Sequence, residues 1–176
     1  DMTRSRGLGD VYKRQELRCN KSPIAIETLE AVGAKTVPIE LEQINEGVQS
    51  GIIVGGESTY PRFFGLKQDE CMNTINDTSH SLFLTSIIVS EGFWNGLDAD
   101  LQAKIKDASF DAARAERVWS VEDIDIVKSS CKEKNINVVT MSDAEKTRFK
   151  EKTAYIYDKY SDMFPEGLVD SIKETK

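Results

Sequence analysis

Histidine and paired cysteines are scarce in this chain, and each shortage excludes a class of function. His80 is the only histidine, so a metal site built from several histidines is excluded. The three cysteines, Cys19, Cys71 and Cys131, are widely spaced and contain no CxxC pair, which argues against a metal centre or a redox pair. Their odd number is compatible with one disulfide and a free thiol, or with three buried thiols. We therefore predict neither a metal nor a cofactor.

An excess of positive charge and a long apolar run are also missing. The chain has 23 lysines and arginines against 30 aspartates and glutamates, a net charge of −7, and its isoelectric point is near 4.9. Such an acidic surface repels phosphates, so we predict no nucleic-acid partner. The longest apolar stretch, residues 81–90, is about half of the roughly 20 residues that a membrane-spanning helix needs, so we predict no membrane span.

The chain does contain enough material for a folded domain, with 176 residues of which 39% are hydrophobic. Residues 1–15 differ from the rest because they are basic, interrupted by glycine and without an apolar signal-peptide core. Their end, Gly9–Gln15, resembles the adapter-derived tail that is sometimes translated at the ends of assembled metagenomic reads. We predict that residues 1–15 are a non-native or disordered tail and that the fold occupies residues 16–176.

After residue 16, short β-like runs alternate with capped helices, and this alternation favours an α/β fold. The predicted strands are rich in β-branched and apolar residues, and the predicted helices begin at N-cap residues or end at glycine. The first half is predicted to run as strand 17–19, helix 22–33, strand 36–39, helix 41–51 and strand 52–54.

The second half is predicted to begin with a polar irregular segment, 57–77, followed by an apolar strand, 82–89, in the centre of a sheet. Helical periodicity then covers residues 98–134. Because one helix of that length is unusual in a compact domain, we expect a break near residues 120–123. The remaining predicted elements are a strand at 137–140, a helix opened by the capping box of Ser142 and Glu145, and a terminal helical turn at 167–173.

Signals for catalysis are weak. His80 is the only candidate for an imidazole base, and Asp77 could orient it in a Ser-His or Cys-His arrangement. A small α/β enzyme of the hydrolase type that uses His80 is therefore the alternative function, although a lone histidine is more often structural. The turn Gly55–Ser58 follows a predicted strand but matches no phosphate-binding motif. A third reading is an acidic helical interaction module built on residues 98–134.

Arg18 is more informative, because it lies near the end of the first predicted strand, where open α/β sheets bind ligands. A guanidinium can hold a carboxylate through two parallel hydrogen bonds, a geometry that lysine does not reproduce. Taken alone, an arginine at such a position is more often a surface residue of an edge strand. The motifs around it change that balance.

Several motifs in this chain agree in their order and spacing with one family. They are Leu17-Arg18, Ser22 to Ala34, Val37-Pro38, Glu46 to Gly51, Gly55 to Glu57, Thr78 to His80, Phe93-Trp94, Leu97 to Gln102 and Val138 to Glu145. In this order the chain resembles the C-terminal half of a solute-binding protein of the tripartite ATP-independent periplasmic (TRAP) transporters, of the DctP type. The resemblance covers residues 16–176 and depends on the order of the motifs, not on any one of them.

The resemblance implies a periplasmic-binding-protein-like α/β fold, in which two lobes joined by crossing strands and a long helix close on a ligand. Residues 16–176 are expected to supply one nearly complete lobe, the crossing strands and the long C-terminal helices. The N-terminal lobe and a signal peptide are expected in a part missing from this sequence. The implied function is not enzymatic: it is periplasmic capture of a small organic anion, a mono- or dicarboxylate, for delivery to the small and large membrane subunits of the transporter.

Four residues fall on ligand-binding positions of that family. Arg18 falls on the signature arginine, which pairs with the carboxylate of the ligand. Ser58 stands where many members carry an asparagine that contacts the ligand, and Leu41 stands where many carry an aromatic residue facing the cleft. Glu57 belongs to a DGxE-like turn in which Val54 replaces the usual aspartate. The resemblance thus implies a carboxylate site formed by Arg18, Leu41, Glu57 and Ser58.

Overall fold

The computed structural model of the chain describes residues 15–175, which divide into two units. Of the described residues, 15–78 and 136–175 form the first unit, and 79–135 form the second. Residues 1–14, which hold most of the predicted tail, lie outside the described residues. Gln15, the last residue of that predicted tail, accepts a hydrogen bond from the backbone N–H of Lys35 at 2.9 Å.

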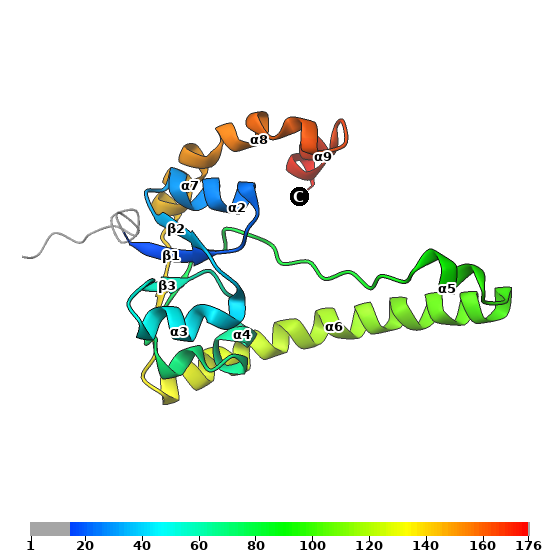
Figure 1. Cartoon of the computed structure of the whole chain (residues 1–176), viewed down its shortest axis with the longest axis horizontal. Helices are drawn as coiled ribbons and strands as arrows, with labels where there is room; N and C mark the ends of the chain where they lie inside the picture. The colour runs from blue at the N-terminus through cyan, green and yellow to red at the C-terminus, as the bar shows by residue number, and fades with distance from the viewer. Residues whose placement is uncertain (1–14, 176) are drawn as a thin grey trace, which may run out of the picture. The chain divides into compact units, whose positions relative to one another are not determined.

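A three-stranded parallel sheet forms the centre of the first unit (Figure 1). Strand β1 (Glu16–Cys19) lies between β2 (Lys35–Pro38) and β3 (Gly55–Gly56). Leu17 pairs with Thr36 on one side and with Gly55 on the other. The predicted order of strand, helix, strand, helix, strand is therefore confirmed, although the third strand lies at residues 55–56 and not at 52–54.

The two helices that connect these strands begin and end close to the predicted residues. Helix α2 (Pro23–Ala31) has Ser22 at its N-cap and proline in its first turn, and Gly33 follows it with φ of 98°. A short 3₁₀ helix, η1 (Leu41–Gln43), leads into α3 (Ile44–Gln49). The buried residues Leu17, Cys19, Leu29 and Ala34, with Ile26 packed against them, form the core between α2 and the sheet.

The strand predicted at residues 52–54 is wrong. The N–H groups of Ile52 and Ile53 both donate to the carbonyl of Gly47, at 2.9 and 3.1 Å, so these two residues form the turn that ends α3. The first hydrogen bond to β1 comes from the N–H of Val54, which donates to Glu16, and the paired residues begin at Gly55. As a result Ile53 is 1% exposed, while Ile52 and Val54 are 55% and 56% exposed.

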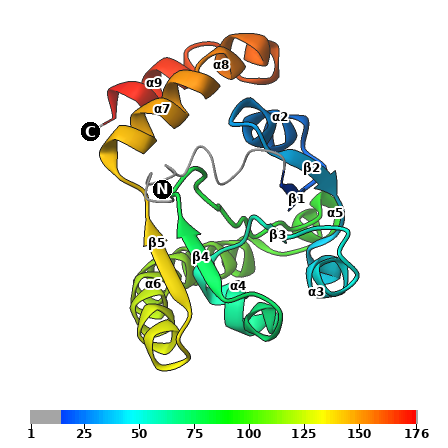
Figure 2. The same ribbon diagram turned by 90° about the vertical axis from the view of Figure 1, so that its left-hand side faces the viewer.

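The prediction that residues 57–77 are irregular is also wrong, because this segment contains regular secondary structure. It forms α4 (Tyr60–Gly65), the 3₁₀ helix η2 (Gln68–Glu70) and strand β4 (Thr74–Asp77). Strand β4 pairs in parallel with β5 (Asn137–Thr140), which confirms the strand predicted there, and the pair forms a second sheet (Figure 2). Strand β4 contains a single apolar residue, Ile75, so periodicity could not reveal it.

The central strand predicted at residues 82–89 is not present. Residues 78–89 have no regular secondary structure, and within the described chain no strand pairs with them. An extended segment becomes a stable strand only when a neighbour accepts and donates its backbone hydrogen bonds. The apolar side chains of this segment are 39% to 88% exposed and are Leu82, Phe83, Leu84, Ile87, Ile88 and Val89.

The long helix of the second unit is continuous. After the short α5 (Glu91–Asn95), helix α6 runs from Ala99 to Glu133, 35 residues, so the break expected near residues 120–123 is wrong. The helix sequence contains no glycine or proline, and serine and aspartate alone do not interrupt a helix. Asp98 caps its start by accepting a hydrogen bond from the N–H of Leu101 at 2.8 Å. No helix within residues 15–175 is both long enough and apolar enough to cross a bilayer.

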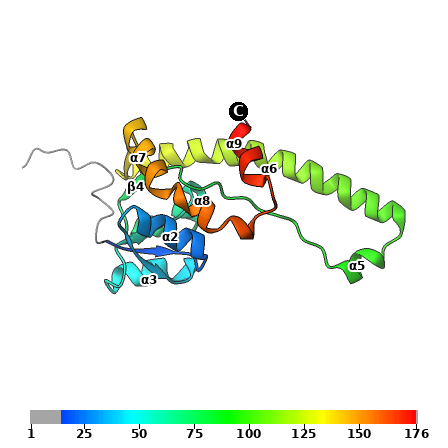
Figure 3. The ribbon, with the colours of Figure 1, turned by 90° about the horizontal axis from the view of Figure 1, so that it is seen from above.

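The C-terminal helices return to the first unit. Ser142 caps the start of α7 (Asp143–Thr153), because its hydroxyl accepts from the N–H of Glu145 at 3.3 Å. Helix α7 is followed by α8 (Tyr155–Lys159), the 3₁₀ helix η3 (Ser161–Met163) and α9 (Leu168–Glu174). Helices α7 and α8 lie beside α2 (Figure 3). The Lys159 ammonium and the Tyr160 hydroxyl each donate to the Glu27 carboxylate at 2.7 Å, and these bonds, led by that of Lys159, lower the pKa of Glu27.

The three cysteines form no disulfide, which excludes the first of the two arrangements considered above. Cys19 and Cys131 are buried, whereas Cys71 is only partly buried. Burial raises the pKa of the Cys19 thiol, so it remains protonated and packs as a small apolar side chain.

Candidate ligand-binding site

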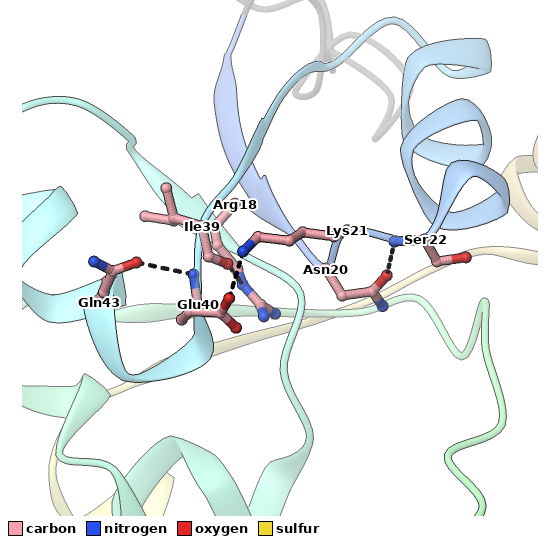
Figure 4. Close-up of polar contacts among 7 residues, drawn as sticks. All are labelled: Arg18, Asn20, Lys21, Ser22, Ile39, Glu40 and Gln43. Carbon is pink, nitrogen blue, oxygen red and sulfur yellow. Dashed lines mark hydrogen bonds and ion pairs between the residues drawn. The ribbon is translucent and has the colours of Figure 1, made fainter.

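Polar side chains gather where the three strands of the first sheet end. Asn20 and Lys21 follow β1, Ile39 and Glu40 follow β2, and Glu57 follows β3. Because the strands are parallel, these residues lie at one edge of the sheet, the edge at which open α/β sheets bind ligands. We call this set of residues, together with Arg18, the carboxyl edge. Figure 4 shows the residues that follow β1 and β2.

Arg18 is the central cation of the carboxyl edge. It is only 7% exposed, and its Nε donates to the backbone carbonyl of Ile39 at 2.9 Å (Figure 4). Among residues 15–175 its side chain makes no other hydrogen bond and no ion pair. A nearly buried guanidinium whose two terminal nitrogens have no protein acceptor is suited to hold an external carboxylate in a bidentate manner.

A glycine allows β3 to approach the backbone of Arg18. Gly56 pairs with Arg18 in the ladder, and a Cβ placed on Gly56 would lie 2.8 Å from Arg18 Cβ and 3.1 Å from its carbonyl oxygen. The N–H of Glu57 then donates to that same carbonyl at 3.2 Å. The position of Arg18 therefore depends on the absence of a side chain at residue 56.

We expect Gly56→Ala to lower the free energy of unfolding by about 1–3 kcal/mol, because either β3 or Arg18 must move to admit the methyl group. Gly55→Ala is the matched control. Its Cβ would meet Met72 Sδ at 3.8 Å and Leu17 Cδ2 at 3.9 Å, which are ordinary contacts. Urea unfolding of the 176-residue chain measures both variants. Equal stability of the two would contradict the close approach of β3 to Arg18.

Glu57, predicted to contact the ligand, joins two loops of the carboxyl edge. Its Oε1 accepts hydrogen bonds from the backbone N–H and the side-chain amide of Asn20, both at 3.0 Å. The Asn20 carbonyl oxygen in turn accepts from the N–H of Ser22 at 2.8 Å (Figure 4). Glu57 thus holds the loop after β1 against the end of β3, and one of its carboxylate oxygens is already used.

The other two predicted site residues are less enclosed. Leu41 is half-buried at the start of η1, directly after Glu40, and Ser58 is exposed directly after Glu57. Both therefore follow strands of the same sheet as Arg18. His80 is half-buried in the irregular segment 78–89. In the described part of the chain, no three His, Cys, Asp or Glu side chains gather in a way that could hold a metal ion.

Lys21 and Glu40 belong to the same edge and were not identified from the sequence. The Lys21 ammonium lies 2.6 Å from Glu40 Oε1. Glu40 also caps η1: its side chain accepts from the N–H of Gln43, and the Gln43 side chain accepts from the N–H of Glu40 at 3.0 Å. The hydrogen bond from Lys21 lowers the pKa of Glu40, and the charge of Arg18 acts in the same direction. The spacing Glu40-x-x-Gln43 was the only sequence signal for this arrangement.

Residues 7–163 match the model of the bacterial extracellular solute-binding protein family 7, DctP. The chain belongs to this family. The resemblance inferred from the sequence motifs is therefore confirmed. The matched range begins at residue 7 and so includes part of the segment predicted to be a tail.

Two curated relatives of this family 7 chain are similar to it over most of its length but have different ligands in their names. The ectoine-binding periplasmic protein TeaA of Halomonas elongata is 27% identical over 92% of this chain and 49% of its own length. The C4-dicarboxylate-binding periplasmic protein DctP of Rhodobacter capsulatus is 25% identical over 84% of this chain and 41% of its own length. The chain thus spans about half the length of the curated relatives it matches.

Solved structures confirm the α/β fold of the periplasmic-binding-protein type. The ectoine-binding protein of Halomonas elongata is 26% identical, has a TM-score of 0.76, and matches 90% of this chain and 52% of its own. A TRAP periplasmic solute-binding protein from Shewanella oneidensis with bound succinate is 21% identical, has a TM-score of 0.84, and matches 92% of this chain and 53% of its own. The family and these similar proteins are solute-binding proteins.

Proposed function

We propose that this chain is the C-terminal half of the periplasmic solute-binding component of a TRAP transporter. In this role it captures a small organic acid and presents it to the membrane subunits of the transporter, without chemical conversion. A second lobe, supplied by the remainder of a longer protein, closes over the ligand.

The observation that carries this proposal is the state of Arg18. Its guanidinium is nearly buried, is oriented by Ile39, and has no carboxylate partner within the described residues. Burying a cation without a counter-ion is costly, and a ligand carboxylate at the carboxyl edge relieves this cost. The names of the relatives agree with such a ligand, because they include C4-dicarboxylate-binding proteins.

Exposed apolar surface supports a second lobe. Six apolar residues of the segment 82–89 are exposed, as are Phe110, Val118 and Trp119 of α6. Large apolar side chains exposed in such number often belong to an interface. Residues 15–175 alone would therefore expose surface that a partner lobe covers.

The proposal is tested by calorimetry on the longer protein that contains this chain, with succinate, butyrate, D-glucuronate and ectoine as ligands. We expect at least one of them to bind with a Kd of about 1 μM or tighter, and succinamide, the uncharged analogue of succinate, to bind at least about 100-fold more weakly than succinate. The bound ligand should be recovered unchanged. The 176-residue chain alone should bind none of them tightly, because a site open to water weakens the ion pair.

Failure of every carboxylate to bind the longer protein would contradict the proposal. Conversion of the ligand during incubation, lost on His80→Ala, would favour the hydrolase alternative.

A further inference from the structure

Two cations of the carboxyl edge differ in one respect: Lys21 has a carboxylate partner, and Arg18 has none. The Lys21 ammonium lies 2.6 Å from Glu40, whereas Arg18 forms no ion pair within residues 15–175. Figure 4 shows the Lys21 ammonium, the Glu40 carboxylate and the Arg18 guanidinium together at the ends of β1 and β2.

We propose that Glu40 is a permanent counter-ion of Lys21 within the protein. Because Glu40 neutralises Lys21, this lobe offers a single cation, Arg18, to the ligand and binds one carboxylate. Glu40 is thus a specificity-determining residue, and the preferred ligand presents one carboxylate to this lobe. This inference rests on the proposed function, and it specifies how many carboxylates of the ligand this lobe binds.

Backbone contacts hold Glu40 in place independently of any ligand. Its side chain accepts from the N–H of Gln43, and its own N–H donates to the Gln43 side chain. It directly follows Ile39, whose carbonyl holds the Arg18 guanidinium. The Glu40 carboxylate is therefore fixed close to Arg18 by the same turn that orients the arginine.

The surroundings of the Glu40 carboxylate favour its ionised form. The hydrogen bond from Lys21, followed by the charges of Lys21 and Arg18, keeps the pKa of Glu40 below its ordinary value. An ionised Glu40 repels any second carboxylate that approaches Lys21. It also pairs with the ammonium that such a carboxylate would need.

Glu57 does not provide an equivalent counter-ion for Lys21. Glu57 follows β3, whereas Glu40 follows β2. The Oε1 of Glu57 accepts from the backbone and the side chain of Asn20. Glu40 is the carboxylate that lies against Lys21.

The test is a double-mutant cycle in the longer protein, with succinate and butyrate as a matched pair of di- and monocarboxylate. Glu40→Gln keeps an oxygen that can cap η1 but removes the charge. It should strengthen succinate binding about tenfold and butyrate binding about threefold, and the gain should shrink in 1 M salt. Glu42→Gln, an exposed neighbour in η1, is the control and should change neither.

Lys21→Met leaves Glu40 without its partner and should weaken both ligands by about threefold to tenfold. The double variant Lys21→Met/Glu40→Gln restores a site with Arg18 as its cation, and it should bind both ligands within about threefold of the parent. If Lys21 contacts the ligand directly, the double variant will instead bind as weakly as Lys21→Met, and this would overturn the inference. The inference would also be overturned if Glu40→Gln bound both ligands with the affinity of the parent, or if Glu42→Gln gained as much affinity as Glu40→Gln.

A measurement that needs no ligand separates this inference from the proposed function. In the 176-residue chain, Lys21→Met should raise the pKa of the Glu40 carboxyl toward its ordinary value, as followed by carbon NMR. An unchanged pKa would show that the pair does not form and would overturn the inference even if carboxylates bind. A raised pKa in a protein that binds no carboxylate would instead count against the proposed function.

Discussion

Replacing Arg18 with alanine in the longer protein should weaken carboxylate binding by about two to four orders of magnitude. Removing one member of a buried charged pair costs about 3–5 kcal/mol, and each tenfold change in Kd corresponds to about 1.4 kcal/mol. Arg18 is only 7% exposed in this lobe, and in the longer protein the second lobe would further shield its contact with a ligand carboxylate from water and salt. An exposed arginine would contribute less than about 1 kcal/mol, so calorimetry separates the two cases.

Two further variants make this result specific. Arg18→Lys keeps the charge but loses the two parallel donors and the Nε bond to Ile39. We therefore expect this variant to bind the carboxylate more weakly than the parent, although its charge is unchanged. Arg148→Ala is the control, because Arg148 is 60% exposed on α7 and paired there with Glu145. It should leave the Kd unchanged. Wild-type affinity in Arg18→Ala would show that the carboxylate is held elsewhere.

The second large effect is expected at Ile53, where alanine should lower the free energy of unfolding by about 2–5 kcal/mol. Ile53 is 1% exposed, and its side chain lies against Gly47 of α3. Truncation leaves a cavity at the point where the turn after α3 meets the sheet. With an m-value of about 2 kcal/mol/M, the urea midpoint should fall by about 1–2.5 M.

The adjacent Ile52 provides a matched control, because the same substitution is made one residue away at a position that is 55% exposed. Ile52→Ala should change the unfolding free energy by less than about 0.5 kcal/mol. Similar losses at both positions would mean that residues 52–54 are a strand buried on both faces, as their composition suggests. A large loss at Ile53 alone supports the turn seen in the structure.

Local signals identified the elements whose cause is local. Ser22 and the following proline begin α2, Gly33 ends it, and the side-chain cap of Ser142 begins α7. These features depend on backbone conformation and on hydrogen bonds within a few residues, so a pattern in the sequence can reveal them. The α/β class and the family followed from the order of such signals along the chain.

Prediction failed where the cause lies far away in the sequence. The run 82–89 has the composition of a central strand, but no strand of the described chain pairs with it. Strand β4 has one apolar residue, and it forms because β5, about 60 residues later, supplies its hydrogen bonds. Apolar composition measures the tendency of a segment to be buried, whereas pairing depends on which other segment is at hand.

By itself the sequence determined that this chain is an α/β member of a solute-binding family, without the histidines or cysteine pairs of a metal centre, and it singled out Arg18. Only the tertiary structure decided how that arginine is held. Its contact with Ile39, the close approach of Gly56, and the pairing of Lys21 with Glu40 join residues that are 19 to 38 positions apart. Charge and burial at such a point arise from packing across three strands, and no local pattern encodes them.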